Sequence, residues 1–172
     1  KEAKGIAVEE SFDTSIDIDI DAYIPMGYIP NEFQKLDIYK RIAGIETEEE
    51  TEEMLEELLD RFGDLPKSVD NLLFIAKIKS MAHHVYFTEV SQKGDHLKFT
   101  LYEKAKINVA GIPELVAAHK DSLRFVADAK APYFIWELNK NTREKKADTK
   151  DILEAFLSEA AEILLPGSTD TK

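Results

Sequence analysis

The sequence predicts an α+β fold in which helices pack on a small, mostly antiparallel sheet. Three observations lead to this prediction. Apolar residues recur at helical spacing over much of residues 31–84, residues 85–138 mostly alternate between apolar and polar side chains, and an amphipathic helix follows near the C-terminus. The resulting order is roughly β-ααα-ββ-α-ββ-α. We expect the domain over residues 15–165, between a polar arm at 1–14 and a tail at 166–172.

The first predicted strand lies in "SIDIDIDAYIP", where isoleucines alternate with aspartates. This period of two gives the strand one apolar and one acidic face. The helix that follows begins after Asn31, a residue typical of N-caps, with Gln34 three residues further on. Its apolar residues at helical spacing are Phe33, Leu36, Tyr39 and Ala43.

Two more helices are predicted before the chain changes to strands. Thr47 and Glu50 form a capping box that starts the first of them, and a glycine directly after Phe62 ends it. The residues expected to face a core near this end are Leu58, Leu59 and Phe62. Pro66 starts the other helix, which runs to about His84. Its apolar residues cover most of the circumference, so we expect a central position for it.

The second half of the chain reads as two pairs of strands and two helices. The first pair surrounds a turn at residues 93–95, and a short helix follows at about 113–120. The second pair lies in "SLRFVADAKAPYFIWEL", around the turn "AKAP". The stretch "DTKDILEAFLSEAAEILL" carries a continuous apolar stripe and predicts the last helix.

The composition indicates a soluble globular protein, with 44% hydrophobic and 33% charged residues in a chain of 172. The 34 acidic and 22 basic side chains give a net charge of −12, which disfavours a dedicated binder of nucleic acid or anionic membrane. The chain has no cysteine, which excludes disulfides and thiolate zinc sites and fits a cytoplasmic location. Because the chain starts at Lys1 without a signal sequence, we expect a fragment of a larger protein.

Patterns typical of catalysis or metal binding are weak. Asp17, Asp19 and Asp21 resemble the start of a calcium loop, but Ala22 stands where such a loop needs glycine. The sequence contains no glycine-rich phosphate loop, no G-x-S-x-G and no H-E-x-x-H motif. We therefore expect no enzyme, metal site or cofactor in this chain. A hydrolase that depends on carboxylates alone stays open, and it would require a pocket with perturbed carboxylates.

One basic stretch offers an alternative function. Residues 140–150 concentrate the positive charges Lys140, Arg143, Lys145, Lys146 and Lys150. Such a cluster could contact nucleic-acid phosphates. No aromatic residue lies among these charges to stack on bases, so a solvated loop is the favoured interpretation.

A charged helix face offers the other candidate site. Glu57, Asp60, Arg61 and Asp64 share one side of the helix that ends at Phe62. The simplest interpretation is solvated surface with a favourable Glu57–Arg61 pair. The functional interpretation is a docking surface for a partner with basic residues, for which Phe62 would be an apolar anchor if it is not in the core.

Three stretches carry a family resemblance: "IPNEFQKLDIYKRIA", "LLDRFGDLP" and the helix directly after Pro66. In this order and spacing, they resemble the C-terminal domain of bacterial transcription-repair coupling factor. The resemblance covers roughly Ile16 to Leu165, and the first half carries it most specifically.

The resemblance implies a parent protein that is an ATP-dependent DNA translocase, which displaces stalled RNA polymerase and recruits the damage-recognition ATPase of nucleotide excision repair. The ATP and Mg sites of the family lie in motor domains that are absent here. The C-terminal domain would be autoinhibitory. It would dock on the parent's N-terminal excision-repair-like module and mask the binding site for that ATPase. Carried over by position, the docking residues are Glu57, Asp60 and Arg61.

Overall fold

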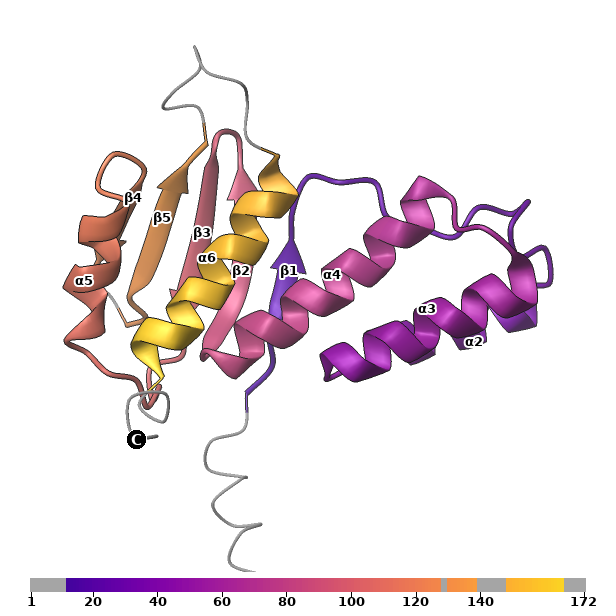
Figure 1. The fold of residues 1–172 in the computed structure, drawn as a ribbon, viewed down its shortest axis with the longest axis horizontal. Helices are drawn as coiled ribbons and strands as arrows, with labels where there is room; N and C mark the ends of the chain where they lie inside the picture. Colours follow the sequence, from indigo (N-terminus) through magenta and orange to yellow (C-terminus); the bar gives the residue numbers. More distant parts are fainter. Residues whose placement is uncertain (1–11, 128–129, 139–147, 166–172) are drawn as a thin grey trace, which may run out of the picture. The chain divides into compact units, whose positions relative to one another are not determined.

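The structure is a computed structural model that describes residues 12–127, 130–138 and 148–165. These residues form, in chain order, β1 (Ser15–Asp17), α2 (Glu32–Ala43), α3 (Glu48–Phe62), α4 (Lys67–His84), β2 (Phe87–Lys93), β3 (His96–Leu101), α5 (Gly111–Ala118), β4 (Leu123–Val126), β5 (Tyr133–Glu137) and α6 (Thr149–Leu164) (Figure 1). The predicted α+β class and order of elements are confirmed. The predicted tail and residues 1–11 of the predicted arm lie outside the described part.

The chain forms two compact units. Unit 1 combines the N-terminal segment up to Ile18 with the chain from Met81 onward, and unit 2 is Asp19–Ser80. α4 therefore contributes most of its length to unit 2 and its last turn to unit 1.

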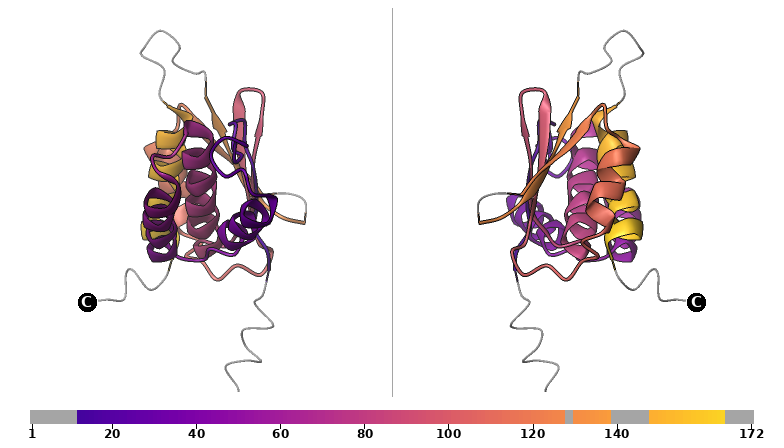
Figure 2. Two further views of the ribbon diagram at one scale, coloured as in Figure 1. Left: turned by 90° about the vertical axis from the view of Figure 1, so that its right-hand side faces the viewer. Right: turned by 90° about the vertical axis from the view of Figure 1, so that its left-hand side faces the viewer.

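Unit 1 is built on a five-stranded sheet of order β1-β2-β3-β5-β4. β1 runs parallel to β2 and the other neighbours are antiparallel, so the sheet is mostly antiparallel, as predicted. α5 and α6 cover the same face of this sheet (Figure 2). Phe156 of α6 packs there on Phe99 of β3, with 4.5 Å between ring centroids. Burial of such aromatic side chains is a main source of stability for this unit.

The N-terminal segment of unit 1 differs from the predicted strand and arm. β1 ends at Asp17 because the chain leaves unit 1 after Ile18, although alternate exposure continues to Asp21. Phe12, expected in the arm, stacks on His83 and Tyr102 with centroid distances of 4.3 and 4.5 Å. The buried hydroxyl of Thr14 donates to the carbonyl oxygen of Phe87 at 2.7 Å. Residues 12–14 therefore belong to the packed part of the unit.

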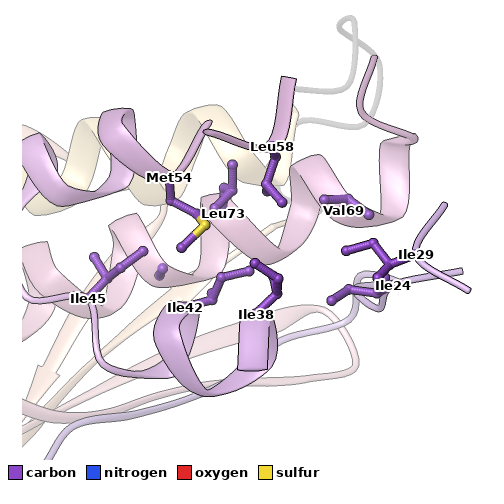
Figure 3. Packing of buried hydrophobic residues seen from close by; sticks show 10 residues of the cluster. Ile24, Ile29, Ile38, Ile42, Ile45, Met54, Leu58, Val69 and Leu73 are labelled. Carbon is purple, nitrogen blue, oxygen red and sulfur yellow. The ribbon is translucent and has the colours of Figure 1, made fainter. Parts of the chain in front are cut away.

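Unit 2 packs α2, α3 and the first part of α4 around one apolar cluster (Figure 3). Its buried members are Ile24, Ile29, Ile38, Ile42, Ile45, Met54, Leu58, Val69, Leu73 and Ala76. The loop before α2 is also fixed by polar contacts. The backbone N–H of Ile24 donates to the Tyr39 hydroxyl at 2.7 Å, and Nδ2 of Asn71 donates to the carbonyl oxygen of Asp21 at 2.8 Å.

The buried face of α2 is not the one that the helical spacing suggested. Ile38 and Ile42 are buried, whereas Phe33 is 84% exposed and Leu36 is 57% exposed. Apolar residues lie on several sides of this helix, so periodicity alone does not select a face. Packing against α3 and α4 selects the isoleucine pair, which lies one helical turn apart.

Within the described residues, no helix is long and apolar enough to cross a membrane. No group of three or more histidine, aspartate or glutamate side chains in the same part of the chain is placed to hold a metal ion. Asp17, Asp19 and Asp21 are exposed and alternate with partly buried isoleucines.

Candidate docking surface

The three predicted docking residues lie on the last turns of α3. Nη1 of Arg61 donates to Oε2 of Glu57 at 2.7 Å, which is the predicted i, i+4 pair. Asp60 lies between them in the sequence, and its side chain is exposed. We call Glu57, Asp60 and Arg61 the candidate docking surface. The structure brings two of its members into direct contact and leaves Asp60 open to solvent.

The geometry of this surface depends on how α3 begins and ends. The Thr47 side chain accepts from the backbone N–H of Glu50 at 3.0 Å, which confirms the predicted N-cap. The Glu50 carboxylate accepts in return from the backbone N–H of Glu46 at 2.7 Å, one residue earlier than a standard capping box. At the other end, Gly63 has φ +88°, a conformation that L side chains rarely adopt.

Phe62 is not an exposed anchor. Its partly buried ring packs against the apolar cluster of unit 2 and lies 5.7 Å from the ring of Tyr28. Leu58 is buried, as predicted, but Leu59 is 44% exposed, so the prediction that it faces the core is wrong. On the helix, Leu59 is rotated about 100° from Leu58, and this turns it out of the interface that holds Leu58.

Arg41 of α2 is a part of the site that the sequence did not reveal. Its Nη1 donates to Oε2 of Glu57 at 2.8 Å and its Nη2 donates to Oε1 at 2.5 Å. The Glu57 carboxylate therefore accepts a bidentate fork from α2 and a further bond from Arg61. Oδ2 of Asp37, one turn before Arg41 in α2, lies 3.8 Å from the same Nη1.

This arrangement fixes the charge of Glu57. The hydrogen bonds from Arg41 and then Arg61 lower the pKa of Glu57 to about 2. The bond to Glu57 in turn raises the pKa of Arg41. The Glu57 side chain is 30% exposed, so water and salt screen the pairs and their net contribution to stability is about 1 kcal/mol or less.

A shallow hollow lies next to the candidate docking surface, between α2 and α3. It has a volume of about 340 Å³ and is lined by Arg41, Gly44, Ile45, Glu50, Glu53, Met54 and Glu57. The pKa of Glu57 is shifted in the direction that keeps this carboxylate ionised, which is the opposite of what a general acid needs. The carboxylate-dependent hydrolase that the sequence left open would need a general acid other than Glu57.

Most of the alternative basic site lies outside the described residues. This holds for Lys140, Arg143, Lys145 and Lys146, whereas Lys150 is in the first turn of α6. Nucleic-acid contact through residues 140–150 stays a prediction.

Comparison with known proteins identifies the family. The TRCF domain family matches residues 18–112. Over 112 residues the chain is 39% identical to the transcription-repair-coupling factor of Bacillus subtilis (strain 168) and 38% identical to that of Staphylococcus haemolyticus (strain JCSC1435). Each match covers 64% of this chain and 10% of the relative, so the chain spans about a tenth of the length of these proteins.

A solved structure extends the similarity to most of the chain. The crystal structure of the C-terminal domain of transcription-repair coupling factor superposes with a TM-score of 0.71 and 26% sequence identity. The match covers 88% of this chain and 94% of the other. The family match at residues 18–112 includes α2 and α3, and therefore all of the candidate docking surface together with Arg41. The chain belongs to the TRCF domain family of the transcription-repair coupling factors.

Proposed function

We propose that this domain is a regulatory docking module of a transcription-repair coupling factor. Its candidate docking surface binds the N-terminal excision-repair-like module of the same protein and masks the binding site for the damage-recognition ATPase of nucleotide excision repair. The observation that carries the proposal is the preorganised group of charges on α3. Glu57 and Arg61 pair at i, i+4 on this helix, directly beside the exposed carboxylate of Asp60.

Exposed charges of this kind suit an interface between two modules that must form and dissociate reversibly. Exposed charges contribute more to orientation and association rate than to affinity, and salt weakens them. A tether between the two modules raises their effective concentration, so modest intrinsic affinity is enough to keep them docked. The surface can therefore be specific without making the contact permanent.

In this proposal, other domains of the parent protein carry out ATP hydrolysis and DNA translocation. ATP and Mg would act in the motor domains, and DNA and RNA polymerase would be contacted through other domains of the parent. This domain contributes regulation through protein–protein contact and no catalytic step. This assignment extends the family membership of the chain to a parent about ten times its length.

The direct test is a calorimetric titration of this domain with the N-terminal module of the same parent, at low and moderate salt. The variant combines Glu57→Ala, Asp60→Ala and Arg61→Ala and must keep the wild-type Tm. Glu52→Ala, an exposed α3 position outside the surface, is the control because it changes the net charge by the same single unit. Salt-sensitive binding that the triple variant loses and Glu52→Ala keeps supports the proposal. Equal binding by all three proteins, or binding by none, refutes it.

A further inference from the structure

The Glu57 carboxylate is already occupied before any partner binds. A carboxylate offers about four acceptor positions, and the two arginines fill three of them. Arg41 contacts both oxygens, whereas Arg61 contacts only Oε2. A cationic side chain from a docking module would therefore meet a carboxylate whose charge is compensated from within the domain.

We infer that Arg41 is a competitor built into the docking surface, and that a partner's cation binds Glu57 by replacing the Arg41 fork. The inference rests on the proposed docking function. It makes docking an exchange of one guanidinium–carboxylate pair for another, instead of the capture of a free carboxylate. The strength of the Arg41 contact then sets how readily the docked state forms.

The partner's cation would displace Arg41, and not Arg61, from the Glu57 carboxylate. Arg61 lies on the same helix as Glu57 at i, i+4, so their pairing needs no contact between helices. Arg41 comes from α2 and has a second acceptor within reach, since Asp37 already lies 3.8 Å from its Nη1. A short rotation of the side chain would pair Arg41 with Asp37 and free one acceptor position on each oxygen of Glu57. Arg61 would keep its bond to Oε2. The displaced cation is thus not left without a counter-ion.

The solvent exposure of the Arg41–Glu57 pair limits how much the removal of Arg41 can change the docking affinity. The side chains of Arg41 and Glu57 are 41% and 30% exposed, and exposed pairs of this kind shift an equilibrium by up to roughly fivefold. Removing Arg41 should therefore tighten docking by about two- to fivefold. The salt dependence should also become steeper, because docking would then form an ion pair without breaking one.

The test is a double-mutant cycle on binding to the N-terminal module, with Arg41→Gln, Glu57→Gln and the double variant. Arg41→Gln should bind two to five times tighter than wild type, and Glu57→Gln should bind more weakly. Arg41→Gln should have no effect when Glu57→Gln is present. Weaker binding by Arg41→Gln overturns the inference, because Arg41 would then position Glu57 for the partner. A Tm measurement on each variant separates these effects from loss of folding.

A second measurement does not depend on the module. The carboxyl ¹³C signal of Glu57 is followed by NMR during titration with methylguanidinium chloride, against sodium chloride at equal ionic strength. If Arg41 competes for Glu57, the Glu57 signal in Arg41→Gln should respond at a methylguanidinium concentration two to five times lower than in wild type. Identical responses of the two proteins overturn the inference. If the module binds no variant but the NMR responses differ, the docking function fails while competition at Glu57 stands.

Discussion

The hydroxyl of Tyr28 donates to the carbonyl oxygen of Gly63 at 2.8 Å, and so connects the loop before α2 to the residue that ends α3. The same hydroxyl lies 3.3 Å from the carbonyl oxygen of Leu58, four residues before the end of α3. The carbonyl oxygen of Gly63 lies just past the last helical residue and therefore has no acceptor role within the helix. Tyr28 therefore holds in place the turn that carries the candidate docking surface.

Replacement of this hydroxyl should cost stability without disturbing the core. Tyr28→Phe keeps the ring that packs on Phe62 but removes the hydrogen bond, so we expect a loss of about 1 kcal/mol in the free energy of unfolding. Urea denaturation measures the change. Tyr23→Phe is the matched control, since Tyr23 is 52% exposed and should change stability by less than about 0.5 kcal/mol. Equal effects of the two substitutions would contradict the role assigned to Tyr28.

The Glu57 pairs should make stability depend on pH over a defined range. The pKa of Glu57 is about 2 in the folded domain, below the ordinary 4.5, so the ionised form is the one that folding favours. The pairs therefore stabilise the fold above about pH 4.5, and this contribution is lost as the pH falls towards 2. Glu57→Gln should be less stable than wild type by about 1 kcal/mol or less at pH 7, and this difference should disappear as the pH falls through about 2. A stability difference that stays constant between these pH values would rule out the pairing as its source.

Gly63 should tolerate a side chain poorly although there is space for one. No heavy atom outside its immediate chain neighbours lies within 4 Å of a Cβ placed there, but φ is +88°. We expect Gly63→Ala to cost about 1–3 kcal/mol through backbone strain alone. Gly27→Ala is the comparison, because Gly27 also has open space around it and does not need a positive φ. Thermal unfolding of both variants should separate strain from steric contact.

The two apolar stripes of α2 should differ sharply in their effect on stability. Ile38→Ala and Ile42→Ala each remove a buried side chain and should cost about 2–5 kcal/mol. Phe33→Ser and Leu36→Ser change exposed positions and should stay within about 0.5 kcal/mol of wild type. Chemical denaturation of the four variants tests this. A large loss in Phe33→Ser would mean that this ring packs within the domain.

Local signals explain why the element order was predictable. The Thr47 cap, the glycine after Phe62 and the change of period near residue 85 each act over a few residues, and the structure retains all of them. The wrong predictions for the buried face of α2 and for Leu59 concern packing between helices. The choice of Ile38 and Ile42 over Phe33 and Leu36 is made by neighbouring helices, so no property of α2 alone determines it.

The Arg41–Glu57 contact could not be predicted from the sequence for a similar reason. The two residues are 16 positions apart on different helices, and their meeting depends on the rotation and sliding of α2 against α3. Only the i, i+4 partner of Glu57 follows from spacing within one helix. The sequence could therefore nominate Glu57, Asp60 and Arg61, but it could not reveal that one of them is already neutralised from α2.

The stack of Phe12 on His83 and Tyr102 has a mechanical consequence. Phe12 precedes β1, which has only three residues and lies at the edge of its sheet. A pulling force applied to the chain ahead of Phe12 would load this aromatic stack first, and the backbone pairing of β1 with β2 only after the stack had opened. Phe12→Ala should thus lower the force of the first rupture in optical-tweezers traces, and an unchanged rupture force would show that the load passes elsewhere.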